Sequence, residues 1–151
     1  MSPARTPAII EPAEPVTATL EGLRILLVDD EDDAREAMTV LLRQAGADVI
    51  AVPSAPLALE ALAKEKLDVL LSDIAMPGED GYALIAKVRS LPAAEGGRIA
   101  AAALTAYATA EDRARVLRAG YQGHFAKPVE PGQLVSAVAA LAERAAAGPR
   151  S

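Results

Sequence analysis

The sequence predicts an α/β fold, in which a doubly wound parallel sheet carries helices on both faces. Short apolar runs alternate with longer segments whose apolar residues recur at helical spacing, and this unit occurs five times in succession. A helix between consecutive strands is the connection that parallel pairing requires. With 151 residues the chain has the length of one domain and can bury a core.

The strands are expected where apolar runs are short and continuous, as in parallel strands that are covered on both faces. They cover residues 23–30, 47–52, 67–73, 98–106 and 123–128.

The helices follow these strands, and their ends carry recognisable signals. The first repeats from Ala34 to Leu42 and stops at Gly46, and the others cover residues 54–66, 82–91, 110–120 and 130–146. Ser54 is a candidate N-cap, Thr109 with Asp112 predicts a capping box, and Pro131 suits a first turn.

Three segments are expected along the chain. Residues 1–22, rich in Pro, Ala and Thr, predict a flexible leader or linker, residues 23–146 a folded domain, and residues 147–151 a disordered tail. No uncharged apolar run approaches the roughly 18 residues of a membrane span, and no signal-peptide pattern opens the chain. We expect a cytoplasmic protein.

Composition excludes several kinds of site. The net charge of −6 argues against a nucleic-acid surface. There is no cysteine, so disulfides and thiolate metal sites are excluded, and the single histidine excludes His-rich zinc sites. Because aromatic residues make up only 3% of the chain, the core must consist mainly of Ala, Leu, Val and Ile.

Polar residues stand at the ends of four of the five strands. Asp29 and Asp30 end the first strand, Asp73 the third, Thr105 the fourth and Lys127 the fifth. The carboxyl ends of parallel strands form the ligand-binding edge of such a sheet, so these side chains are expected in one crevice. Carboxylate oxygens suit Mg²⁺, and a cation would relieve the repulsion among them.

Each of these residues also has an ordinary explanation. The acidic run from Asp29 to Asp33 favours a helix start, which accounts for Asp32 and Asp33. Taken singly, Thr105 and Lys127 are unremarkable at strand ends. Asp73 decides for a site, because a carboxylate that ends a central apolar strand is costly unless it is paired or metal-bound.

Four motifs in order resemble the receiver domain of two-component response regulators. They are VDD at residues 28–30, SDIAMPGEDG at 72–81, LTA at 104–106 and KP at 127–128, and the resemblance runs from residue 23 to about 145. It implies a flavodoxin-like (βα)5 sheet with strand order 2-1-3-4-5. It also implies that the chain is a phosphoacceptor of a phosphorelay and not an enzyme in the ordinary sense, although it assists its own phosphorylation and dephosphorylation.

The resemblance assigns roles to the residues at the strand ends. Asp73 would accept a phosphoryl group from the phosphohistidine of a histidine kinase. Asp30 would bind Mg²⁺ directly, Asp29 mostly through a water molecule, and the carbonyl of Ala75 would be a further ligand. The catalytic set would be Asp73, Lys127 and Thr105, since Lys127 would contact the phosphoryl oxygens and Thr105 would hydrogen-bond one of them.

The family pattern also carries expectations for neighbouring positions. The Lys127–Pro128 bond is expected to be cis. His124 stands where many receivers have an aromatic switch residue, and Tyr107 stands at a position that tunes phosphoaspartate hydrolysis. A downstream protein partner is expected on the face of the fourth helix, fifth strand and fifth helix, with no nucleic acid or membrane partner. Whether the chain is a stand-alone regulator or the receiver of a hybrid histidine kinase stays open.

Other functions fit the sequence less well. A dinucleotide-binding enzyme needs a glycine-rich turn after the first strand, where this chain has DDEDDA. A haloacid-dehalogenase-like phosphatase, the main alternative, would need a second Asp two residues after Asp73, where Ala75 stands. A calcium loop of the EF-hand type would need a central glycine and a closing glutamate, which residues 29–40 lack.

Overall fold

A computed structural model describes residues 19–106 and 109–146. Most of the expected leader, the expected tail and Tyr107 lie outside the described residues. Among the described helices, none combines the length and the apolar character needed to cross a membrane.

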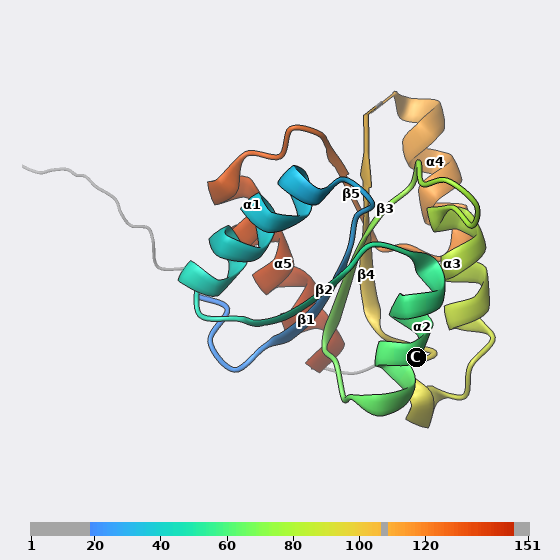
Figure 1. The fold of residues 1–151 in the computed structure, drawn as a ribbon, viewed down its shortest axis with the longest axis horizontal. Helices are drawn as coiled ribbons and strands as arrows, with labels where there is room; N and C mark the ends of the chain where they lie inside the picture. Colours follow the sequence, from blue (N-terminus) through green and yellow to red (C-terminus); the bar gives the residue numbers. More distant parts are fainter. Residues whose placement is uncertain (1–18, 107–108, 147–151) are drawn as a thin grey trace, which may run out of the picture.

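Five parallel strands form one sheet in the order β2-β1-β3-β4-β5, as predicted (Figure 1). The strands are β1 (Arg24–Val28), β2 (Asp48–Val52), β3 (Val69–Asp73), β4 (Ala100–Thr105) and β5 (Gly123–Ala126). The pairing register sets Val28 beside Ser72, and Asp73 beside Leu104. The carboxyl ends of β1, β3 and β4 therefore lie next to one another at one edge of the sheet.

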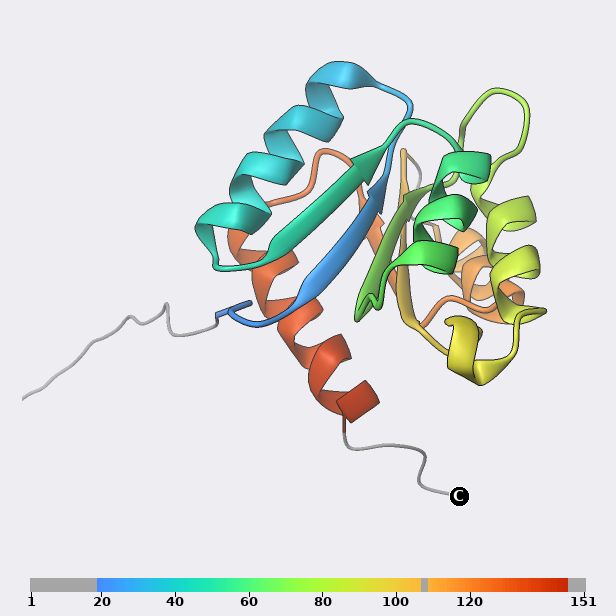
Figure 2. The ribbon, with the colours of Figure 1, turned by 60° about the horizontal axis from the view of Figure 1, so that its bottom comes forward.

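Helices cover both faces of the sheet. They are α1 (Asp32–Gln44), α2 (Ala55–Lys64), α3 (Gly81–Arg89), α4 (Ala110–Ala119) and α5 (Pro131–Ala146). Figure 2 shows α1 and α5 on one face of the sheet and the other three helices on the opposite face. This is the doubly wound arrangement that the alternating pattern predicts.

The sheet divides the apolar interior into two clusters, because successive side chains of a strand point to opposite faces. In β1, Ile25 and Leu27 pack with α1 and α5, whereas Leu26 and Val28 pack with α2 and α3. Strand β4 supplies four alanines in a row, and all four are buried. The core consists mainly of aliphatic side chains, as the composition predicts.

Several helix ends follow the sequence signals. Gly46, after α1, and Gly120, after α4, have positive φ angles of 108° and 125°. The Thr109 hydroxyl accepts a hydrogen bond from the backbone N–H of Asp112 at 3.1 Å and caps α4. Ser54 occupies the N-cap of α2, but its side chain makes no capping hydrogen bond. For α3 the N-cap is Asp80, which the sequence pattern did not single out.

Two details of the fold lie outside the sequence prediction. Leu20, in the stretch assigned to the leader, is fully buried in the cluster of α1 and α5, and its backbone N–H donates to the carbonyl of Ala45 at 2.8 Å. The packed structure thus begins before Leu23. A short 3₁₀ helix, η2 (Ala93–Glu95), forms between α3 and β4, where the sequence predicts neither a helix nor a strand.

Candidate functional site

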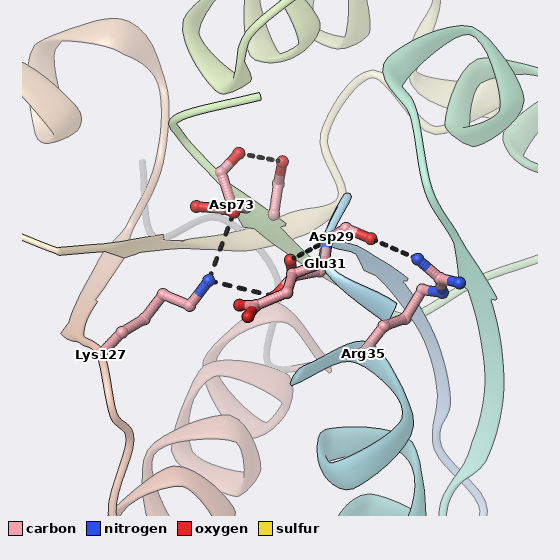
Figure 3. Close-up of polar contacts among 6 residues, drawn as sticks. Asp29, Glu31, Arg35, Asp73 and Lys127 are labelled. Atoms are coloured by element: carbon pink, nitrogen blue, oxygen red, sulfur yellow. Dashed lines mark hydrogen bonds and ion pairs between the residues drawn. The ribbon is translucent and has the colours of Figure 1, made fainter. Parts of the chain in front are cut away.

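At the carboxyl edge of the sheet, Figure 3 shows three of the predicted side chains, Asp29, Asp73 and Lys127, pointing toward one another. Asp29 and Asp30 directly follow β1, Asp73 is the last residue of β3, and Lys127 follows β5. Thr105 is the last residue of β4, and its carbonyl accepts a hydrogen bond from the backbone N–H of Lys127 at 2.8 Å. Residues at the carboxyl ends of four neighbouring strands therefore form the site.

Three carboxylates form the centre of the site. One oxygen from each of Asp29, Asp30 and Asp73 lies within 4.8 Å of the other two. Asp29 is fully buried and Asp73 is 5% exposed, whereas Asp30 is exposed. Two carboxylates with little access to water so close together need a positive charge beside them.

Lys127 supplies a positive charge. Its ammonium group lies 3.2 Å from Asp29 Oδ2 and 3.3 Å from Asp73 Oδ2. Burial lowers the pKa of Lys127, but the charges of Asp29 and Asp73 and its hydrogen bonds to them raise it more. The net pKa lies above the ordinary lysine value, so the ammonium form is favoured.

Asp73 titrates differently from an exposed aspartate. Burial raises its pKa above the usual value, and the neighbouring charges of Asp29 and Asp30 add to the rise, while Lys127 opposes it. Two hydrogen bonds hold the backbone around this residue: the N–H of Ile74 donates to the carbonyl of Leu104 at 2.9 Å, and the side-chain Oγ of Ser72 donates to the carbonyl of Asp73 at 3.0 Å. The carboxylate thus stands on a fixed backbone and carries an unfavourable negative charge in the metal-free protein.

The turn that carries Asp29 is held by a residue that the sequence did not reveal. Arg35 of α1 donates one hydrogen bond to the carbonyl of Asp29 at 2.9 Å and another to the carboxylate of Asp32 at 2.6 Å. The backbone N–H of Glu31 donates to Asp29 Oδ1 at 3.0 Å. The three-residue spacing of Asp32 and Arg35 was visible in the sequence, but the contact with Asp29 depends on the shape of the turn.

The structure also places three other positions for which the sequence carried expectations. The Lys127–Pro128 bond is cis, as predicted. His124 pairs with Ala103 in the register of β4 and β5, so its side chain is on the same face of the sheet as that of Thr105. The Nε2 atom of His124 is buried and has no hydrogen-bond partner among the described residues. Ala75 is exposed in the loop two residues after Asp73.

The donor set fits a small divalent cation. Mg²⁺ binds oxygen ligands at about 2.0–2.1 Å in an octahedron, so two of its ligands lie at most roughly 4.2 Å apart. Three carboxylate oxygens already within 4.8 Å of one another need only small shifts to meet that limit. Because Lys127 adds a positive charge beside Asp73, the site can bind a cation and an anionic group next to one nucleophilic carboxylate.

A model of the response regulator receiver domain family matches residues 25–139, which is most of the chain. The chain belongs to this family. The matched residues run from within β1 to within α5, and they include each of the side chains in the site.

Related proteins of known sequence fall into two groups by length. An uncharacterized 14.6 kDa protein of Leptolyngbya boryana is 44% identical over 120 residues, which are 80% of this chain and 90% of that protein. The response regulator protein FleR of Pseudomonas aeruginosa is 33% identical, over 77% of this receiver but only 24% of FleR. The sensor protein GacS of Pseudomonas syringae is 33% identical, over 76% of this chain and 13% of GacS. The receiver thus corresponds to a small part of the larger relatives.

Solved structures support the same assignment. A response regulator structure from Chloroflexus aurantiacus has a TM-score of 0.76 and 34% identity, covering 81% of this chain and 98% of that one. The receiver domain of a sensor histidine kinase from Pseudomonas aeruginosa, solved with magnesium in its active-site cleft, has a TM-score of 0.73 and 30% identity over the same shares. These likenesses and the strand order identify the flavodoxin-like receiver fold.

Proposed function

We propose that this receiver accepts a phosphoryl group on Asp73 from the phosphohistidine of a histidine kinase, with Mg²⁺ held by the neighbouring carboxylates. The observation that carries the proposal is the shared contact of Lys127 with Asp29 and Asp73 beside Asp30. The ammonium group of Lys127 and a metal ion bound by the carboxylates would then lie on either side of the Asp73 carboxylate. That is the charge pattern a transferred phosphoryl group requires.

The residues divide the work as follows. A carboxylate oxygen of Asp73 attacks phosphorus, the phosphorus–nitrogen bond of the phosphohistidine breaks, and an acyl phosphate forms on Asp73. Lys127, already within hydrogen-bonding distance of Asp73, neutralises charge on the phosphoryl oxygens. Thr105, at the end of the adjacent strand, donates its hydroxyl to one of those oxygens. Asp30, Asp73 and the Ala75 carbonyl would hold Mg²⁺ directly, and Asp29 mostly through a water molecule; the ion, when bound, would neutralise further charge on the phosphoryl group.

A haloacid-dehalogenase-like phosphatase would use Asp73 in the same first step. It would then need an acid and base beside the nucleophile to release the leaving group and activate water. The residue two positions further on is Ala75, whose side chain cannot transfer a proton. This favours a receiver, whose phosphorylated state persists as a signal.

Phosphorylation can be tested with the full chain and a small phosphodonor. Incubation with acetyl phosphate and Mg²⁺ should add one phosphate to the intact mass, and Asp73→Asn should abolish the addition. Asp48→Asn is the matched control, because Asp48 is exposed at the amino end of β2, beside the start of β1 and away from the carboxyl edge of the sheet. A phosphate that persists in Asp73→Asn would refute the assignment. Transfer from a histidine kinase is then measured with the phosphorylated kinase as donor.

Metal binding can be tested separately. Mg²⁺ should raise the melting temperature by relieving carboxylate repulsion, and Asp30→Ala should remove most of this rise. Retention of the full Mg²⁺-dependent rise in Asp30→Ala would show that Asp30 is not a ligand.

We expect the downstream partner to bind on the face formed by α4, β5 and α5. Thr105 ends the strand beside β5, and Lys127 follows β5 itself, so a phosphoryl group on Asp73 would act first on this side of the sheet. A protein in the cytoplasm that distinguishes the two states would bind there. Amide NMR shifts on phosphorylation should concentrate on this face, and shifts spread evenly over the domain would contradict the expectation.

A further inference from the structure

A groove of about 830 Å³ opens at the other end of the sheet from the carboxylates. It lies among the C-terminal turns of α3, α4 and α5 and the segments that lead into β4 and β5. Figure 2 shows the last turn of α5 at the end of the sheet away from the start of α1. Ala100, at the start of β4, lines the groove, so the groove and Thr105 are separated by roughly 17 Å along that strand.

The groove is positively charged. Three arginines line it, Arg89, Arg98 and Arg144, and none of its described lining residues is acidic. Arg89 is held in place, since its guanidinium donates to the carbonyls of Gly97, Ile99 and Gly120 at 2.7–3.0 Å. It contributes a fixed charge to the groove floor.

Arg98 and Arg144 have free donors. Both side chains are exposed, and neither forms a hydrogen bond or ion pair with another residue in the described part of the chain. Two unpaired guanidinium groups can each bind a carboxylate through two parallel hydrogen bonds. Such a concentration of unpaired positive charge stands out in a protein with a net charge of −6.

Apolar side chains line the same groove as the arginines. They include Leu117 of α4, which is 43% exposed, together with Leu141 and Tyr121. Tyr121 is 2% exposed, and its hydroxyl already donates to the carbonyl of Gly81, so it presents little polar character. An apolar side chain of a ligand could cover Leu117 and remove that surface from water.

We propose that this groove binds a short acidic segment of a partner protein, with carboxylates on Arg98 and Arg144 and an apolar side chain on Leu117. Several lining side chains, including those of Leu117 and both unpaired arginines, are exposed, so the groove is open and would leave a small ligand largely in water. A peptide segment covers more of it. Nucleic acid is disfavoured by the acidic remainder of the protein.

The position of the groove permits this contact together with the proposed phosphorylation. A segment bound at the amino ends of β4 and β5 would leave Asp73 open to a kinase at their carboxyl ends. The groove would then hold a partner in place independently of the phosphorylation state.

The test uses the full chain and a fluorescein-labelled peptide in which Glu and Leu alternate, followed by fluorescence anisotropy at low ionic strength. The double variant Arg98→Glu, Arg144→Glu should weaken binding by about tenfold or more, because two charge-assisted contacts become repulsions. The matched control is Arg113→Glu, Arg118→Glu, which changes the net charge equally on exposed positions of α4 that do not line the groove. It should weaken binding by no more than about twofold.

Two further arms separate the contributions. Leu117→Gln should weaken binding of the peptide without a loss of the circular dichroism signal, since the side chain is already partly exposed. A peptide with Gln in place of Glu should bind weakly. Equal losses in the two double variants, equal binding of the Gln peptide, or no binding of the Glu peptide would overturn the proposal. Binding of octanoate in the groove without binding of the peptide would also overturn it, in favour of a small anion.

Discussion

Replacing Lys127 with methionine should destabilise the metal-free receiver and much less so the magnesium-bound one. The ammonium group lies 3.2 Å and 3.3 Å from two carboxylates whose side chains are 0% and 8% exposed. At an effective dielectric constant of about 20, each such pair contributes about 5 kcal/mol of attraction. The lost hydration of the lysine and of the carboxylates offsets much of this, but removing the lysine leaves both carboxylates unpaired.

We therefore expect Lys127→Met to lower the free energy of unfolding by about 2–4 kcal/mol in EDTA. Methionine keeps the aliphatic length of the side chain, so the loss reports mainly on the charge. Addition of Mg²⁺ should recover part of the loss, because a cation at Asp29, Asp30 and Asp73 replaces the missing positive charge. Urea unfolding followed by circular dichroism, with EDTA and with MgCl₂, measures both quantities.

The control is Lys64→Met. Lys64 pairs with Glu60 at 3.7 Å, but the two side chains are 69% and 60% exposed. An exposed pair of this kind should contribute less than about 0.5 kcal/mol, with no dependence on Mg²⁺. If Lys127→Met costs no more than Lys64→Met in EDTA, Lys127 does not balance the buried carboxylates and the electrostatic account of the site is wrong.

Three other changes follow from the same structure. Asp73→Asn should stabilise the metal-free protein near neutral pH. Burial raises the pKa of Asp73 in the folded protein, so the free energy of unfolding is highest below the unfolded-state pKa of this residue. That extra stability is lost as the pH rises through the folded-state pKa. Urea unfolding in EDTA should show that the difference in the free energy of unfolding between Asp73→Asn and the unmodified protein becomes smaller toward acidic pH. A difference that does not change with pH would contradict the raised pKa. Gly81→Ala should cost about 1–3 kcal/mol, because a Cβ there would lie 2.5 Å from the carbonyl oxygen of Asp73, whereas Gly132→Ala, with nothing within 4 Å, should be neutral or stabilising by thermal melt. Thr109→Ala should cost about 1 kcal/mol by loss of the α4 cap, and an unchanged melting temperature would show that the cap contributes nothing.

Much of the fold could be predicted because its signals are local and repeated. Continuous apolar runs mark strands that are covered on both faces, and glycines at Gly46 and Gly120 mark helix ends where φ is positive. The strand order needed the family resemblance, since alternation alone allows more than one arrangement of a parallel sheet. The clustering of Asp29, Asp30, Asp73 and Lys127 followed once the carboxyl ends were placed on one edge.

What the sequence did not reveal depends on contacts between distant or irregular segments. Leu20 is an apolar residue in a Pro/Ala-rich stretch, and its place in the core depends on packing in the cluster of α1 and α5 and on the hydrogen bond to Ala45, which the sequence does not show. Arg35 looks like one end of an exposed helix pair until the turn after β1 places the carbonyl of Asp29 within reach. The unpaired arginines of the groove come from α5 and the segment before β4, so no local pattern joins them.

The alanine run of β4 limits how the interior can respond to chemistry at Asp73. Alanine has no side-chain torsion to rearrange and loses no side-chain entropy on folding. Of the residues in β4, only Leu104 and Thr105 can change rotamer, and they are the two closest to the carboxyl edge, where Leu104 pairs with Asp73. Side-chain adjustment within this strand is therefore confined to the end nearest Asp73, and the rest of the strand can move only together with its backbone.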